Sequence, residues 1–375
     1  MSFEVVVNGS IEGRNSVSHD MPDVSHMDYP GVTQHKPLWE MIVKTLFYFP
    51  VIVFGIIGNV IIIAVVAKNK RMQTTTNYYI VNLAVADCLI TLACSWTHLV
   101  DDLSPFWILG SFFCTFNTFS QVLTLVASIF TLTVIACDRF FGIVFSMKAH
   151  FIERRASFTI ILIWMLSIIV ASPLIYYRRL NEVHWQNLVE TWCDDDWPVD
   201  VWHDPETGLE VPMTPARRFY YMFVCVALFF VPCLVMSAAY LIIIITLWSA
   251  QVPGERISKD IKSQTKIRKK VVLMLVVILA FFILCWMPLV VSIIYAEFVH
   301  NKIKELKDWY TDFNYFARYL AHSNSAINPF IYAGFNDNFK KGFQNLYRGG
   351  DRRSRYNTMV SRVDSFQSST HMTKL

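Results

Sequence analysis

The sequence predicts an all-α membrane protein, a seven-transmembrane helix bundle followed by a short amphipathic eighth helix. Apolar residues make up 54% of its 375 positions and charged residues 17%, against about 25% charged in an ordinary soluble domain. Apolar runs of roughly the 20 residues that a spanning helix needs recur along the chain. These observations favour a multi-pass membrane protein over a soluble fold.

The apolar runs divide the chain into four parts. A polar head (1–40) precedes the bundle (41–334), which is followed by the amphipathic helix (335–347) and a Ser/Thr-rich tail (348–375). Within the bundle we expect membrane spans near 41–67, 78–100, 112–146, 157–177, 219–248, 270–298 and 311–334. The amphipathic helix is expected to lie on membrane lipids with an apolar stripe of Phe335, Phe339, Phe343 and Leu346.

Charge distribution predicts how the helices are oriented. The segment ERISKDIKSQTKIRKK, between the fifth and sixth spans, holds seven basic residues against two acidic ones, whereas the loop from 178 to 218 is acidic. Because loops rich in Lys and Arg stay in the cytoplasm, we expect the head outside the cell and the tail inside. The sequon Asn8-Gly9-Ser10 is usable for glycosylation only with the head outside. We therefore expect a multi-pass protein of the plasma membrane.

Two of the eight cysteines lie outside the predicted membrane interior. Cys114 begins the third span on its outer side, and Cys193 lies in the acidic outer loop. Both face an oxidising compartment, so a disulfide between them is expected, with two free thiols as the alternative. Alternating β-branched residues on both sides of Cys193, from Val189 to Val199, predict a hairpin that Pro198 interrupts.

The second span, within NYYIVNLAVADCLITLACSW, carries one carboxylate, Asp87, at its middle. A charged group at the centre of a bilayer costs roughly 2.5–3.5 kcal/mol, so this carboxylate needs polar partners inside the protein. A structural hydrogen-bond hub and a cation site both satisfy that need, and the two can coexist.

Each predicted helix carries a short motif. In chain order the motifs are Gly58-Asn59, NLAVAD ending at Asp87, CDRF with Asp138-Arg139, Trp164, Pro232 with Tyr240, CWMP at Cys285–Pro288 and NPFIY at Asn328–Tyr332. This set resembles the rhodopsin-like (class A) G-protein-coupled receptors over roughly residues 40–347. The resemblance implies a receptor and not an enzyme, with a heterotrimeric G protein, receptor kinases and arrestin as partners and no role for nucleic acid.

The resemblance also assigns residues to two sites. It implies an allosteric sodium ion, and no other cofactor, at Asp87, Ser128, Asn324 and Asn328. It implies an activation switch and G-protein contact at Asp138, Arg139, Tyr240, Phe282, Pro288, Asn328, Pro329 and Tyr332. Arg268 stands where some of these receptors carry a glutamate that clamps the arginine, so we expect a loosely held resting state with basal signalling.

Residues near the outer ends of the spans indicate the ligand class. His322 stands where light-sensing relatives carry a lysine, and Gln121 replaces the aspartate of amine receptors. A neutral glutamine suits a C-terminal amide. A glutamine at this position resembles the receptors for neuropeptide Y, neuropeptide FF and orexin-like peptides. Glu297 matches an acidic position that pairs with a peptide arginine, although Arg318 is a competing internal partner. Arg318 is also placed to receive an acidic group of the ligand.

The sequence thus predicts a receptor for an extracellular neuropeptide that is C-terminally amidated and basic. The expected ligand-binding residues are Gln121, Glu297, Trp286, Asp101, Asp102, Arg318 and His322. One alternative is a class A receptor for a lipid or another small molecule. A more remote alternative is a seven-helix transporter or proton channel, in which Asp87, Arg318 and His322 would form a relay.

Overall fold

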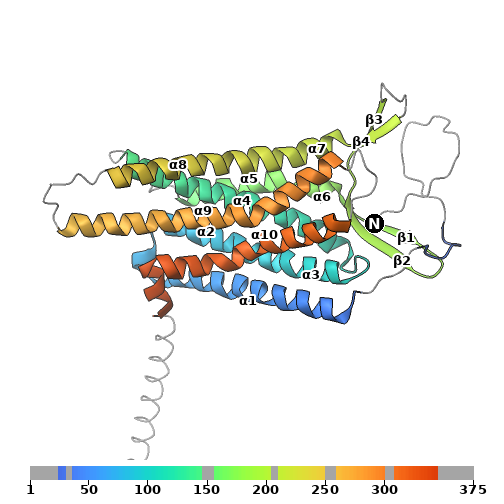
Figure 1. Cartoon of the computed structure of the whole chain (residues 1–375), viewed down its shortest axis with the longest axis horizontal. Helices are drawn as coiled ribbons and strands as arrows, with labels where there is room; N and C mark the ends of the chain where they lie inside the picture. Colours follow the sequence, from blue (N-terminus) through green and yellow to red (C-terminus); the bar gives the residue numbers. More distant parts are fainter. Residues whose placement is uncertain are drawn as a thin grey trace, which may run out of the picture.

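The computed structural model describes residues 24–30, 36–145, 156–203, 210–249, 259–299 and 308–344. The sequon at Asn8, Leu346 of the predicted apolar stripe and the tail from 348 to 375 lie outside the described residues. The described chain forms a long helical bundle with two small β-sheets at one end, which we call the hairpin end (Figure 1). The other end, where residues 337–344 form a last short helix, is the tail end.

The bundle consists of seven rods, some of which contain more than one helical segment. They are α1 (Leu38–Lys68); α2 (Thr75–Ile90) with η2 (Thr91–Ser95) and α3 (Trp96–Leu103); α4 (Gly110–Val144); α5 (Ala156–Ala171) with α6 (Pro173–Tyr177); α7 (Pro215–Met222) with η4 (Phe223–Phe230) and α8 (Val231–Ser249); α9 (Lys259–Val299); and α10 (Asp308–Phe335). A short turn, η1 (Lys70–Met72), links α1 to α2. The predicted seven-helix architecture is confirmed.

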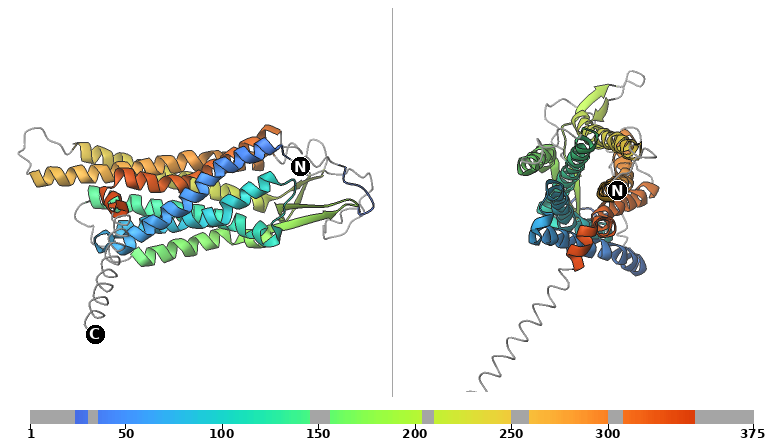
Figure 2. Two further views of the ribbon diagram at one scale, coloured as in Figure 1. Left: turned by 90° about the horizontal axis from the view of Figure 1, so that it is seen from below. Right: turned by 90° about the vertical axis from the view of Figure 1, so that its left-hand side faces the viewer.

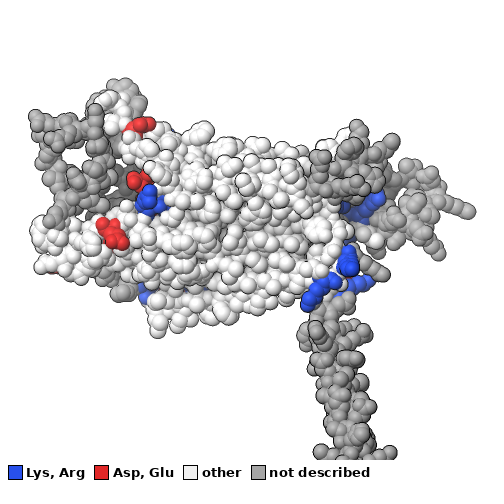
Figure 3. Space-filling view, turned by 180° about the vertical axis from the view of Figure 1, so that it is seen from behind, with Lys and Arg blue, Asp and Glu red and all other residues white. Residues whose placement is uncertain are grey.

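Among the described residues, six rods are long and apolar enough to cross a membrane. The seventh, α10, is more polar, and four of its polar residues are buried: His322, Asn324, Ser325 and Asn328. It packs between α1 and α9, so these groups face the bundle interior (Figure 2). The outer face is different: Figure 3 shows a broad uncharged band between the two ends, as contact with hydrocarbon requires.

Close approaches fix the first rod against its neighbours. A Cβ placed on Gly58 of α1 would lie 2.6 Å from a ring carbon of Pro329 on α10, so only glycine fits there. Its neighbour Asn59 is fully buried, and its Nδ2 donates to the backbone oxygen of Ser325 at 2.8 Å. The Gly58-Asn59 motif therefore joins the first rod to the seventh.

Another motif residue joins three rods. The indole Nε1 of Trp164 on α5 donates to Oδ1 of Asn82 on α2 at 2.8 Å. Nδ2 of the same asparagine donates to the hydroxyl of Thr131 on α4, also at 2.8 Å. Since both ends of the buried amide are used, α2, α4 and α5 are held in one relative position.

The β-strands form two antiparallel pairs. Strand β1 (Arg178–His184) pairs with β2 (Val189–Asp195), and β3 (Asp200–His203) pairs with β4 (Glu210–Met213). The sequence predicted a hairpin with one strand on each side of Cys193, and its second strand was wrong. Cys193 lies in β2, which pairs with the preceding strand β1 at Leu180, and Pro198 lies between the two sheets. Backbone N–H of Trp107, in the α3–α4 loop, donates to the oxygen of Thr191 at 2.9 Å and so anchors the first hairpin.

The last helix, residues 337–344, turns away from α10 and packs back on the bundle. Phe339 is fully buried, with its ring 5.5 Å from that of Tyr332. Gly342 contacts α1 so closely that a Cβ would lie 2.4 Å from a methyl group of Val65. Phe339 of the predicted stripe therefore packs in the protein core, with Phe335 and Phe343 partly buried against the core, and contact of this helix with membrane lipids stays a prediction.

Candidate functional site

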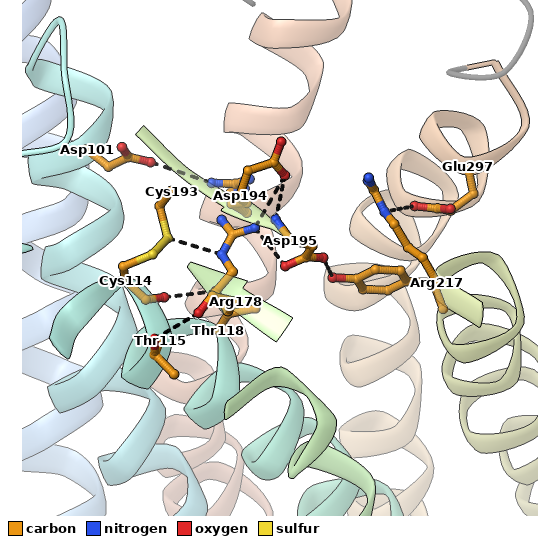
Figure 4. A network of polar contacts seen from close by, with 12 residues as sticks. Asp101, Cys114, Thr115, Thr118, Arg178, Cys193, Asp194, Asp195, Arg217 and Glu297 are labelled. Carbon is orange, nitrogen blue, oxygen red and sulfur yellow. Dashed lines mark hydrogen bonds and ion pairs between the residues drawn. A yellow bond between two sulfur atoms is a disulfide. The ribbon is translucent and has the colours of Figure 1, made fainter. Parts of the chain in front are cut away.

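The predicted disulfide between Cys114 and Cys193 is present and ties β2 to the start of α4, with Cα atoms 5.6 Å apart (Figure 4). Beside it, Arg178 of β1 pairs with Asp195 at 2.9 Å, and its Nε donates to the Cys193 sulfur at 3.1 Å. Asp195 also accepts a hydrogen bond from the Tyr221 hydroxyl on α7. The hairpin is therefore attached to two rods, covalently to α4 and by polar contacts to α7.

Five polar residues from α3, α4 and α10 meet at the hairpin end, and we call them the polar floor: His98, Asp101, Gln121, Arg318 and His322. Nδ1 of His98 lies 3.2 Å from Nη1 of Arg318, and its Nε2 lies 3.3 Å from Oε1 of Gln121. Because a guanidinium only donates, Nδ1 is the acceptor and Nε2–H donates to the glutamine. Asp101 lies 3.9 Å from Arg318, and His322 lies beneath His98 with ring centroids 5.0 Å apart.

The structure thus brings together four of the predicted ligand-binding residues, and it adds His98. The sequence did not single out this histidine, although it lies three residues before Asp101 on α3 and so shares its face. Gln121 is partly exposed, whereas His322 is fully buried, and both of its ring nitrogens have no hydrogen-bond partner among the described residues. A ligand arriving from the hairpin end therefore meets Gln121 and His98 before His322.

Asp102, the fifth predicted binding residue at this end, is already neutralised by two lysines. Nζ of Lys36 lies 2.9 Å from one carboxylate oxygen, and Nζ of Lys44 lies 2.6 Å from the other. Burial and the neighbouring Lys44 lower the pKa of Lys36 from its ordinary value, although its hydrogen bond to Asp102 acts in the opposite direction. This cluster fastens the start of α1 to α3.

Glu297 also has an internal partner, but not the one expected. Its carboxylate lies 3.0 Å from Nε of Arg217 on α7, and its side chain is 8% exposed. Arg218, the next residue, donates to the backbone oxygen of Glu297 at 3.2 Å. Arg318, the partner considered from sequence, pairs with Asp101 instead. The sequence did not point to Arg217, because nothing in the local pattern separates it from Arg218.

The CWMP motif lies within α9, which continues through Pro288 without ending. Trp286 is 3% exposed, and its ring lies 6.1 Å from that of Phe282, one turn earlier. Phe282 in turn contacts Phe229 of η4 at 6.1 Å. These aromatic rings pack α9 against the fifth rod, and Trp286 is a buried residue rather than part of an exposed surface.

Asp87 is 2% exposed and accepts two hydrogen bonds from α10. The hydroxyl of Ser325 donates at 2.9 Å and Nδ2 of Asn328 at 2.7 Å. Ser325 was not among the predicted companions, whereas Ser128 and Asn324 are buried as expected. The Oδ1 atoms of Asn324 and Asn328 are buried, with no hydrogen-bond partner in the part of the chain that the structure describes. Carboxylate, amide and hydroxyl oxygens are the donors that a hard cation prefers, so these residues fit a sodium ion.

At the tail end, Arg139 Nη2 pairs with Asp138 at 2.9 Å, and the hydroxyl of Thr76 donates to the same carboxylate. Two further predicted members of the switch, Tyr240 and Tyr332, are buried nearly completely.

The part of α9 near the last helix has an acidic partner that the sequence did not indicate. Nζ of Lys270 lies 2.8 Å from both carboxylate oxygens of Asp337, at the start of the last helix. These hydrogen bonds lower the pKa of Asp337 from its ordinary value. Arg268, which stands where some of these receptors carry a glutamate, is exposed, and it is Lys270 of the same helix that makes this contact.

Seven packed helices, with a tethered hairpin at one end and an Asp-Arg pair at the other, have the architecture of a seven-transmembrane receptor. The family model for the 7 transmembrane receptor (rhodopsin family) matches residues 58–332, so the chain belongs to this family. Membership confirms the expected receptor class, in place of an enzyme, and argues against the transporter or proton-channel alternative.

Named relatives give the same assignment. The substance-P receptor of Rattus norvegicus is 30% identical over 313 residues, which are 84% of this chain and 72% of that protein. The substance-P receptor of Homo sapiens is 29% identical over the same shares. The neuromedin-K receptor of Rattus norvegicus is 29% identical over 84% of this chain and 65% of its own length. The finer likeness to the neuropeptide Y and neuropeptide FF groups stays a prediction.

Proposed function

We propose that this protein is a plasma-membrane receptor for an extracellular neuropeptide, C-terminally amidated and basic, that signals through a heterotrimeric G protein. The named relatives support a peptide ligand, since substance P and neuromedin K are the ligands in their printed names. The observation that carries the proposal is the polar floor, which gathers groups for a polar ligand terminus at the end with the tethered hairpin. In this proposal the hairpin end is extracellular, which also makes Asn8 a glycosylation site.

The hydrogen-bond pattern of the polar floor supports an amide. Oε1 of Gln121 is taken by His98, so the side chain has its NH₂ group left for the carbonyl of a ligand. The free lone pair of His322 is placed below to accept from the ligand NH₂, once His98 moves aside. A free carboxylate has no such hydrogen to donate. A basic residue of the ligand would approach Glu297, Asp101 and Asp102, the acidic residues of this end.

The opposite end supports coupling to a G protein. Within the described part of the chain, Arg139 pairs with the neighbouring Asp138 and has a side-chain exposure of 31%, so a partner helix can reach it. Tyr240 and Tyr332 are proposed to meet Arg139 after α9 moves outward about Pro288. A sodium ion held by Asp87, Ser128, Asn324 and Asn328 would favour the resting state, in which α9 has not moved outward. Kinase sites and arrestin binding are proposed for the tail, which lies outside the described residues.

A signalling assay on cells that express the chain tests the proposal. The cells receive short peptides that end in Arg-aromatic-amide, each paired with its free-acid form. We expect a response to the amides alone, with potency reduced about tenfold or more by Gln121→Ala because a hydrogen bond to the ligand is lost. Gln186→Ala, a glutamine change in the hairpin turn, is the matched control. Silence across the panel, with surface expression confirmed, would refute an amidated-peptide ligand and favour a lipid or another small molecule.

A further inference from the structure

Each of the three acidic residues expected to attract a cationic ligand is paired within the described part of the protein. The most exposed of them, Asp101, pairs with Arg318. Asp102 is held by two lysines, and Asp195 by Arg178 and the Tyr221 hydroxyl. Glu297 differs from these because, among the described residues, Arg217 is the one side-chain partner of its carboxylate, and the Glu297 side chain is only 8% exposed. Removing the one partner of a buried carboxylate leaves an uncompensated charge, which is strongly destabilising. The carboxylate must therefore receive another cation in exchange.

Arg217 is suited to leave this carboxylate. It lies in the first turn of α7, and Figure 4 shows it between Glu297 on one side and Asp195 on the other. Its guanidinium lies 5.9 Å from the ring centre of Tyr221, within the range of a cation–π contact. A rotation about its own side-chain bonds therefore takes the guanidinium from Glu297 toward Tyr221 and the aspartates of β2 without placing the charge in an apolar environment.

The contact also joins two rods at this end. Arg217 holds the carboxylate of Glu297, and Arg218 holds its backbone oxygen. Only the first of these contacts depends on the glutamate side chain. Replacing Arg217 by an external guanidinium would leave Glu297 neutralised but would remove the ion pair between α9 and α7, while the contacts of Arg218 with the Glu297 backbone oxygen and the Phe298 ring remain.

We propose that Glu297 is a guanidinium-binding site that Arg217 fills in the free protein, so that a cationic ligand binds by displacing the internal arginine. Arg217 is then a specificity-determining residue: it sets the affinity that an incoming cation must exceed, and it excludes weakly basic ligands. The identity of the natural ligand as a basic peptide rests on the proposed function. The existence of an exchangeable guanidinium site does not, so the two can be tested apart.

Chemical rescue tests the site with a probe of known composition. The full chain is purified with Arg217→Ala, and its melting temperature is measured with and without ethylguanidinium chloride, against choline chloride at equal concentration. We expect Arg217→Ala to lower the melting temperature and ethylguanidinium to restore at least half of the loss. The wild-type protein and the double variant Arg217→Ala/Glu297→Gln should show no specific rise, because one site is filled and the other lacks its charge.

Arg218→Ala is the matched control, since it removes the adjacent arginine and leaves the carboxylate paired; ethylguanidinium should not rescue it. Where Arg217→Ala gives too little folded protein, Arg217→Gln leaves the same charge unpaired with a smaller loss of volume. Absence of rescue in a folded Arg217 variant would overturn the proposal. Equal rescue in the variant that lacks Glu297 would overturn it as well, since the probe would then act elsewhere.

A ligand-based arm separates this inference from the proposed function. With an activating peptide, Arg217→Gln should raise the potency of the arginine form about tenfold and leave that of a citrulline analogue unchanged. Unchanged potency of the arginine form would count against displacement. If no peptide activates the wild-type chain, the proposed function fails, while the rescue experiment still decides whether Glu297 is an exchangeable site.

Discussion

Replacing Asp87 by asparagine should abolish a specific effect of sodium on stability. Asp87 is 2% exposed, and each of its two carboxylate oxygens accepts one hydrogen bond, from Ser325 and Asn328. Asparagine keeps the size of the side chain but removes the charge on which cation binding depends. The neighbouring amide oxygen of Asn324 is buried without a partner, so the site has a further donor to offer a cation.

The size of the effect follows from linkage. A ligand present at ten times its dissociation constant stabilises the folded state by RT ln 11, about 1.4 kcal/mol. Since about 1 kcal/mol shifts the melting temperature of a domain of 150–250 residues by roughly 2–4 °C, and larger units shift less, we expect a rise of about 3 °C. The variant should show no rise beyond that of the salt control.

The assay is thermal unfolding of the purified protein in sodium chloride against choline chloride at equal ionic strength. Asp138→Asn is the control, because it removes a carboxylate at the tail end, away from the proposed site, and should leave the sodium effect intact. An equal sodium-specific rise in Asp87→Asn would refute the assignment. So would a wild-type protein that melts at the same temperature in both salts.

Three further substitutions test other contacts. Asp337→Asn should raise basal signalling above that of the wild type, because it frees Lys270 of α9. The exchanged pair Lys270→Asp with Asp337→Lys should return basal signalling to the wild-type level. Unchanged basal signalling in Asp337→Asn would show that the ion pair does not restrain α9. Gly342→Val should reduce folded protein at the cell surface because its Cβ would clash with α1, whereas Gly334→Val, with open space around it, should not; equal expression would contradict the packing. Cys193→Ser should destabilise the protein by at most about 4.5 kcal/mol, given a sequence separation of 79, and an unchanged melting temperature would argue against a structural role.

Sequence patterns predicted the features that local chemistry determines. The length of the apolar runs predicted the rods, since the thickness of a bilayer sets the length of each spanning helix separately. Two cysteines on one side of the membrane were enough to predict the disulfide of Cys114 and Cys193. Asp87 drew attention because a lone carboxylate in an apolar run must find partners wherever the helices meet.

The pairing of charges could not be predicted in the same way. Asp101, Asp102 and Glu297 were all expected to face a ligand, but each has a cation from another helix, and that partner depends on how the rods are rotated about their axes. The amphipathic stripe of the last helix had the same ambiguity. The spacing of the stripe defines an apolar face but does not say whether that face contacts lipid or protein. The contact between Phe339 and Tyr332 shows that Phe339 packs on the protein.

The unbroken length of α9 has a mechanical consequence. Glu297 lies about 14 Å from Pro288 along the helix axis, and Lys270 lies about 27 Å from it on the other side, at 1.5 Å per residue. A tilt about the proline that moves Glu297 by about 1 Å therefore moves Lys270 by about 2 Å. That displacement would stretch the 2.8 Å contact with Asp337 past the 4 Å limit of an ion pair. The helix acts as a lever with a gain of about two, so a side-chain exchange at one end is sufficient to open a salt bridge at the other.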